Sequence, residues 1–170
     1  MHHLITAARA AVLQQNWYAA LTLVLTFPDV CGKMDDPDMG STARSIAWFN
    51  DNMAPRYTQT LAQNVVQTFL NGEDCYALRC AFLHEGSLDL TNQRVRDALD
   101  NFVFITPPPN GNIMHMNTFG RQLQLQVDIF VEELCCGVES WLARTGSDTE
   151  ISSRLLRLSR IYNPITKGPH

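Results

Sequence analysis

Apolar residues spaced three and four apart constrain the fold of this chain more than any other sequence feature. That spacing places apolar side chains on one face of an α-helix. It recurs in five segments that each stop close to a proline or a glycine, namely residues 4–27, 41–53, 58–70, 73–85 and 122–144. A loop is expected over residues 29–40 and a helical turn over 91–99. Asp148 or Thr149 is expected to cap a last helix that runs to about Ile161.

The pattern changes at residues 101–106, which are β-branched and aromatic and are followed by three prolines. They predict a strand, and residues 113–117 are expected to pair with it through a turn at 110–111. Such a ribbon is marginal alone and must lie on the helices. We therefore predict an all-α helical bundle with a small two-stranded β-ribbon accessory at about 101–117. One domain is expected to span residues 1–170, with a loose tail at about 162–170.

The charge of the chain excludes a broad basic surface. The formal net charge is -4, and charged residues make up 18% of the 170 residues. This argues against a protein that grips duplex DNA over a wide face. Among the 13 basic residues only Lys33 and Lys167 are lysines, so the rest are arginines. A small phosphate site built from a few arginines remains compatible with this composition.

The cysteines and the apolar runs indicate the cellular compartment in which the protein is expected. There are five cysteines, without a Cys-x-x-Cys spacing, and Cys135 and Cys136 are adjacent. We therefore expect reduced thiols in a cytoplasmic protein. No signal peptide is visible, and the longest nearly apolar run, residues 17–27, is too short to cross a bilayer. A membrane partner is not expected.

The most informative stretch is residues 72–86, Gly-Glu-Asp-Cys-Tyr-Ala-Leu-Arg-Cys-Ala-Phe-Leu-His-Glu-Gly. Arg79 and His84, with four residues between them, lie near the end of the helix that Gly86 closes. This stretch resembles the HEPN family (higher eukaryotes and prokaryotes nucleotide-binding domains), whose signature is an arginine, four to six residues and a histidine near a helix end within a helical bundle. The resemblance covers about ten positions and the order of the helices.

The resemblance implies a metal-independent endoribonuclease, of the toxin or antiviral and stress-effector type, that needs no cofactor. It also implies a homodimer with a composite site, RNA as a partner, and an antitoxin or nucleotidyltransferase protein as a further partner. The two residue types suit this chemistry. His84 would be the general acid or base, and Arg79 would stabilise charge on the phosphate. Asp74, Cys80 and Glu85 are the expected supporting residues.

Helix geometry favours two copies. Residues five apart lie about 140° apart around a regular α-helix, so Arg79 and His84 do not share a face. A second copy related by a two-fold axis would bring two arginines and two histidines to one cleft. The alternative is that Arg79 pairs with an acid such as Asp74 or Glu85, while His84 caps its helix.

A second functional alternative rests on Cys80. The family often has a polar residue directly after the arginine, where this chain has Cys80. That difference favours a non-catalytic HEPN-like module that binds a nucleotide or a protein partner. Cys80 and His84 are four apart and could begin a metal site, but no second pair with ligand spacing completes it, and no metal is expected.

Further candidates lie outside this stretch. Three arginines recur every three residues near the end of the chain, and they are expected to contact RNA phosphates or an acidic partner, or else to form a solvated helix face: Arg154, Arg157 and Arg160. His115, between two methionines, is expected to be a surface or packing histidine.

Overall fold

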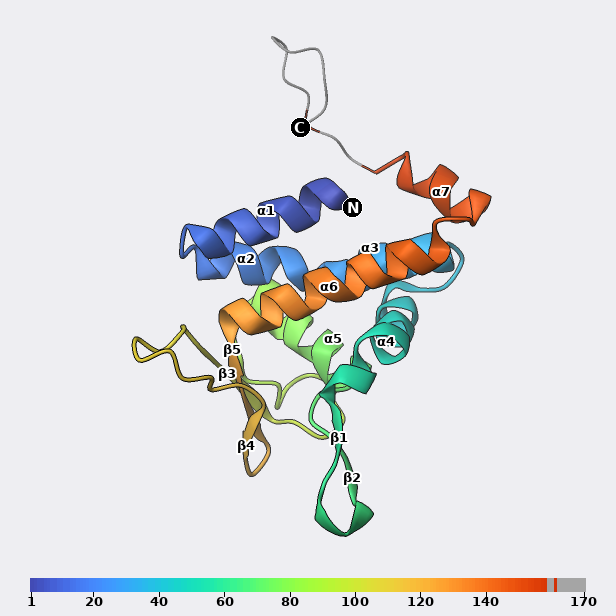
Figure 1. The fold of residues 1–170 in the computed structure, drawn as a ribbon. Coiled ribbons are helices and arrows are strands. Elements are labelled where there is room, and N and C mark those ends of the chain that lie inside the picture. The colour runs from blue at the N-terminus through green and yellow to red at the C-terminus, as the bar shows by residue number, and fades with distance from the viewer. Residues whose placement is uncertain (159–160, 162–170) are drawn as a thin grey trace.

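The first apolar segment forms two helices rather than one. The computed structural model, drawn in Figure 1, describes residues 1–158 and 161. Helix α1 (His2–Leu13) ends before a polar turn, and α2 (Trp17–Val24) follows it. In that turn Gln15 has φ +56°, and the Asn16 side chain accepts a hydrogen bond of 3.3 Å from the Ala19 amide. The prediction of one helix over 4–27 is wrong because a side-chain cap and a left-handed residue reverse the chain.

Pro28 lies at the start of a helix instead of ending one. Helix α3 (Phe27–Asp35) occupies much of the segment predicted as a loop. Proline is tolerated in a first helical turn, where its missing N–H has no intrahelical partner. Asp29 in the first turn and Lys33 in the last turn both suit the helix dipole. The helix expected after residue 40 is confirmed as α4 (Ser41–Asn52).

Residues 58–70, predicted as a helix, form a projecting β-hairpin. A short 3₁₀ helix (Ala54–Tyr57) leads into β1 (Thr58–Thr60), which pairs antiparallel with β2 (Val66–Thr68). Gln63 and Asn64, both with positive φ, turn the chain between the strands. Figure 1 shows this hairpin extending away from the helices. The helix prediction fails because no surface covers an apolar face here, and β-branched side chains then favour strands.

The helix expected over 73–85 is confirmed in two parts. Helix α5 (Gly72–Cys80) continues into a single π-helical turn (Ala81–Glu85), and Gly86 ends it with φ +64°. Residues 91–99, predicted as a helical turn, form an irregular loop without a helix.

The second sheet corrects the predicted ribbon. Strands β3 (Asn101–Ile105), β4 (Asn117–Phe119) and β5 (Gln122–Gln126) lie in the order β3-β5-β4. The predicted strand at 101–106 exists, but it pairs in parallel with β5 rather than with residues 113–117. Strand β4 pairs antiparallel with β5 across a turn at Gly120.

Strand β5 leads without a loop into the longest helix. Helix α6 (Val127–Thr145) therefore begins five residues after the predicted start at residue 122. Helix α7 (Thr149–Leu155) follows, and its first amides donate hydrogen bonds to the Asp148 side chain, as predicted. It ends before the predicted limit at residue 161, and the predicted tail at 162–170 lies outside the described residues.

The all-α prediction is wrong: the described chain is mostly helical but carries two small sheets. Two segments account for the difference. Residues 58–70 are a hairpin, and residues 122–126 alternate glutamine and leucine with Leu123 and Leu125 fully buried. That alternation is the period of a strand with one face in the core.

One face of α6 forms the centre of the core. Figure 1 shows α6 lying along α2 and α3 with α1 beside it. The buried side chains of this face follow one another at helical spacing, and they are Val127, Phe130, Val131, Leu134, Val138 and Trp141. Trp141 meets Trp48 of α4 edge to face, with ring centroids 6.3 Å apart. Arg9 of α1 pairs with Glu132 and Glu139 on the rim of α6.

A buried polar cluster ties the 106–116 connection to α6. Glu133 accepts a hydrogen bond from the Tyr57 hydroxyl (2.6 Å) and lies 3.1 Å from Nε2 of His115. The backbone N–H of Gln126 donates to Nδ1 of His115, which leaves the ring proton on Nε2 for Glu133. His115 is thus a packing histidine, with only 5% of its side chain exposed.

We expect Gly72→Ser to destabilise the fold. A Cβ atom at Gly72 would lie 2.4 Å from the backbone carbonyl oxygen of Ile46, so α5 and α4 would have to separate. Such overpacking costs about 1–3 kcal/mol of unfolding free energy. The matched control is Gly40→Ser, because nothing lies within 4 Å of a Cβ atom there. Urea unfolding measures both, and equal midpoints for the two variants would contradict this packing.

We expect Tyr57→Phe to reduce the loss of stability at high pH. Burial, first, and the nearby Glu133 carboxylate raise the pKa of Tyr57 well above its ordinary value. Above about pH 10 the unfolded phenol ionises while the native one keeps its proton, so stability falls as pH rises, by about 1.4 kcal/mol per pH unit. Tyr57→Phe removes the tyrosine part of the slope from urea-unfolding free energies and leaves the part that comes from buried cysteines with raised pKa values. Tyr18→Phe, at an exposed tyrosine, keeps both parts. Equal slopes in both variants would refute the assignment.

Candidate functional site

Helix α5 holds the Arg79–His84 segment at both ends. The Asn71 side chain accepts a hydrogen bond of 2.9 Å from the Asp74 amide and caps the first turn. At the other end Gly86 is left-handed, a conformation that favours glycine. The motif therefore lies in a helix with defined ends rather than in a loop.

His84 lies within a π-helical turn that begins two residues after Arg79. The wider turn begins at Ala81, between Arg79 and His84. In a regular helix the two positions would be about 140° apart, but a turn with i→i+5 hydrogen bonds brings residues five apart closer to one side. The local backbone thus reduces the angular separation that the sequence alone implied. Single π turns of this kind occur frequently at functional sites.

Arg79 is held against α3 by Asp29. Its Nη2 lies 3.5 Å from Oδ2 of Asp29, and only 18% of its side chain is exposed. Its guanidinium carbon lies 5.8 Å from the centroid of the Tyr76 ring, a cation–π contact. The Nε atom of Arg79 is buried without a hydrogen-bond partner among the described residues.

Asp29 also binds a second arginine, Arg44. Its Oδ1 accepts hydrogen bonds from Nε of Arg44 (2.7 Å) and from the Ser41 hydroxyl (2.9 Å). Two guanidinium groups therefore share one carboxylate at the junction of α3, α4 and α5. The alternative that Arg79 pairs with an acid agrees with this geometry, but the acid is Asp29, which the sequence did not single out.

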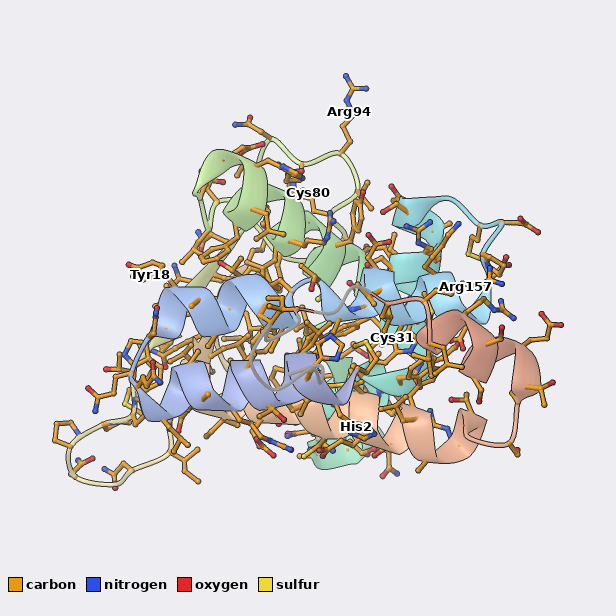
Figure 2. All side chains as sticks on the ribbon, turned by 90° about the horizontal axis from the view of Figure 1, so that it is seen from above. His2, Tyr18, Cys31, Cys80, Arg94 and Arg157 are labelled. Carbon is orange, nitrogen blue, oxygen red and sulfur yellow. The ribbon has the colours of Figure 1, made fainter. Side chains whose placement is uncertain are left out.

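His84 lies at the surface and is free of protein partners. Its side chain is exposed, and it makes no hydrogen bond or ion pair within the part of the chain that the structure describes. Cys80, one turn earlier, is a half-buried free thiol. Figure 2 shows Cys80 on the side of the molecule formed by α5, below the projecting Arg94.

Asp74 and Glu85, the expected supporting acids, bind other groups. Asp74 is 1% exposed, and its carboxylate accepts hydrogen bonds from the backbone amides of residues 97–99, at 2.8–3.3 Å. Glu85, in the π turn, accepts a hydrogen bond of 2.7 Å from the side-chain amide of Gln93. The two acids therefore attach the 90–100 loop to α5 and the π turn, and within the described residues neither acid pairs with Arg79 or His84.

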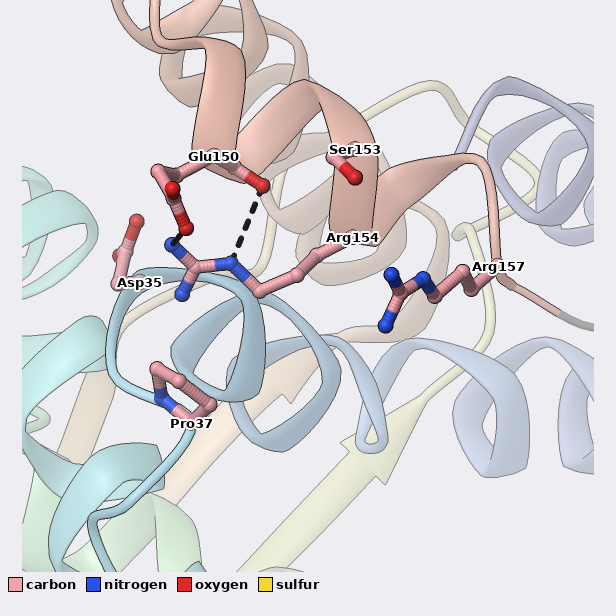
Figure 3. Close-up of a pocket in the computed structure, with 6 residues that line it drawn as sticks. All are labelled: Asp35, Pro37, Glu150, Ser153, Arg154 and Arg157. Carbon is pink, nitrogen blue, oxygen red and sulfur yellow. Dashed lines mark hydrogen bonds and ion pairs between the residues drawn. The ribbon is translucent and has the colours of Figure 1, made fainter.

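The arginines in and just after α7 form a separate group. Arg154 donates to the Glu150 carbonyl oxygen (3.1 Å), and its Nη2 lies 3.7 Å from the Glu150 carboxylate, as Figure 3 shows. Arg157 is exposed and lines the same open pocket of about 520 Å³, together with Asp35 of α3. Figure 2 shows Arg157 toward the opposite end of the molecule from Tyr18. Arg160 lies outside the described residues.

Two features are absent from the described residues. They contain no group of three or more histidine, cysteine, aspartate or glutamate side chains placed to hold a metal ion. Within the same residues, every helix is too short or too polar to span a bilayer.

Comparison with known proteins assigns no family to the chain. No family model matches it, and no curated protein and no solved structure is significantly similar to it.

Proposed function

We propose that the chain binds RNA and cleaves it without a metal ion, at a HEPN-type site formed by Arg79 and His84. The π turn that contains His84 and begins two residues after Arg79 is the observation that carries the proposal. It brings an exposed histidine, free of protein partners, toward the side of the helix that bears a fixed guanidinium. A helix that only packs needs neither the widened turn nor the free imidazole.

The two groups supply complementary parts of one reaction. The 2′-hydroxyl oxygen of RNA attacks the adjacent phosphorus, the bond to the 5′-oxygen breaks, and a 2′,3′-cyclic phosphate forms. The His84 imidazole accepts the proton of the 2′-hydroxyl or gives one to the 5′-oxygen. The Arg79 guanidinium stabilises the charge that develops on the phosphate oxygens.

Two copies of the chain complete the site in this proposal. The attacking and leaving oxygens lie on opposite sides of phosphorus, so a base and an acid are required at the two ends. One copy supplies a single His84. A second copy related by a two-fold axis supplies the other histidine and a second Arg79. RNA phosphates outside this two-copy site would bind Arg154 and Arg157. An antitoxin or nucleotidyltransferase protein would be a further partner in the cytoplasm.

The alternative function is a non-catalytic module that binds a nucleotide or a protein partner. The Arg79–Asp29 ion pair favours it, because Asp29 neutralises part of the charge that the phosphate would require. Cys80, in place of a polar side chain after Arg79, agrees with it.

We expect Arg79→Ala and His84→Ala each to lower RNA cleavage by at least about 100-fold, the usual contribution of an acid–base group. The assay follows a mixed RNA substrate in the presence of a chelator. Arg94→Ala and His2→Ala are the matched controls, because both side chains are exposed and lie outside the motif. Thermal unfolding checks that each variant is folded. Equal cleavage by all five proteins, or none by the parent, would reject catalysis and leave the binding module.

We expect His84→Ala chains to inhibit parent chains when the two are mixed. A dimer of one parent chain with one His84→Ala chain holds a single histidine, so it lacks either the base or the acid of the composite site. After joint unfolding and refolding in equal amounts, random pairing should lower cleavage to about half that of the same quantity of parent alone. A solution mass of 19.2 kDa, that of one chain, or cleavage equal to that of the parent alone, would contradict the composite site.

A further inference from the structure

A neutral cleft lined by aromatic rings lies beside the π turn. Its volume is about 160 Å³. Its walls come from Trp17 and Tyr18 of α2, Phe82 of the π turn and Phe104 of β3. Phe82 belongs to the same π turn as His84, but residues two positions apart point to different sides of a helix, so the cleft and the imidazole face different ways.

The shape and charge of the cleft restrict its occupant. Its lining side chains include no charged group, and Thr106 supplies the one aliphatic hydroxyl, at an exposed position. A charged group would lose its hydration there without compensation. The volume is below the few hundred Å³ of a pocket for a drug-sized ligand, so a single planar ring system fits better than a longer segment. The occupant is therefore a neutral, flat group whose polar edge faces outward.

We propose that this cleft binds one nucleobase of the RNA. The inference rests on the proposed function, because RNA as the ligand is taken from it. A nucleobase is neutral near pH 7, flat, and stacks on aromatic side chains whatever its sequence. In this proposal the uncharged cleft binds a base, whereas the Arg79 guanidinium and the His84 imidazole bind the charged backbone.

Tyr18 is the residue that tests the cleft with least risk to the fold. Its side chain is 76% exposed at the rim, and Figure 2 shows it projecting from α2. Trp17 is the natural reporter, because Trp48 and Trp141 are each only 2% exposed and a ligand at the surface cannot reach them. A base stacked in the cleft should quench the fluorescence of Trp17.

The experiment titrates the full chain with adenosine, cytidine and ribose 5-phosphate in a chelator. We expect the two nucleosides to quench tryptophan fluorescence and ribose 5-phosphate to have no effect. Tyr18→Ala should weaken nucleoside binding about tenfold, within the range for loss of one stacking partner. Phe119→Ala, which removes a 65% exposed aromatic ring on β4, is the matched control and should bind as the parent does. Trp17→Phe should abolish the signal.

The outcomes separate failure of nucleobase binding in the cleft from failure of RNA cleavage. Absence of quenching by both nucleosides, or equal binding by Tyr18→Ala and the parent, overturns the cleft even if RNA is cleaved. Quenching by N-acetylphenylalaninamide but not by nucleosides also overturns it and assigns the cleft to a protein side chain. Nucleoside binding that depends on Tyr18, in a protein that does not cleave RNA, supports the cleft and rejects only catalysis. His84→Ala should lose cleavage and retain nucleoside binding.

Discussion

Burial of one face of α6 is the constraint on which the rest of the structure depends. Phe130, Leu134, Val138 and Trp141 place an apolar stripe along this helix, and segments from the first half of the chain cover it. Because β5 enters α6 without a loop, the position of the helix also fixes the three-stranded sheet. The sheet in turn fixes the Phe104 wall of the cleft, so the candidate ligand surfaces on α2 and β3 are aligned by packing rather than by loops.

The sequence predicted those elements in which local and tertiary preferences agree. Helix α4, the α5 segment and most of α6 have a helical apolar period, and each stops near a glycine or proline. Prediction failed where a single residue decided between alternatives. Gln15 in a left-handed conformation divides the first helix, and Pro28 is as compatible with a helix start as with an end. The Gln-Leu alternation at 122–126 is typical of a strand, but it was assigned to the helix because the helical apolar period follows it directly.

The candidate site was predictable only in part, for a different reason. Arg79 and His84 are close in sequence, so their spacing can be recognised directly. Asp29, which holds Arg79, lies fifty positions earlier on another helix, and no spacing rule links them. The π turn is equally hidden, because hydrogen bonding, and not residue type, distinguishes it from an α-helical turn. The same holds for the neutral cleft, whose walls come from elements that meet only in the fold.

The ion pairs between Arg9 of α1 and Glu132 and Glu139 of α6 have a consequence for synthesis of the chain on the ribosome. The partners are 123 and 130 residues apart, so α1 leaves the ribosome long before the surface it covers exists. Contacts this distant in sequence slow folding and leave apolar segments exposed meanwhile. The apolar faces of α1 and α2 that pack on α6 thus stay uncovered until α6 has been synthesised.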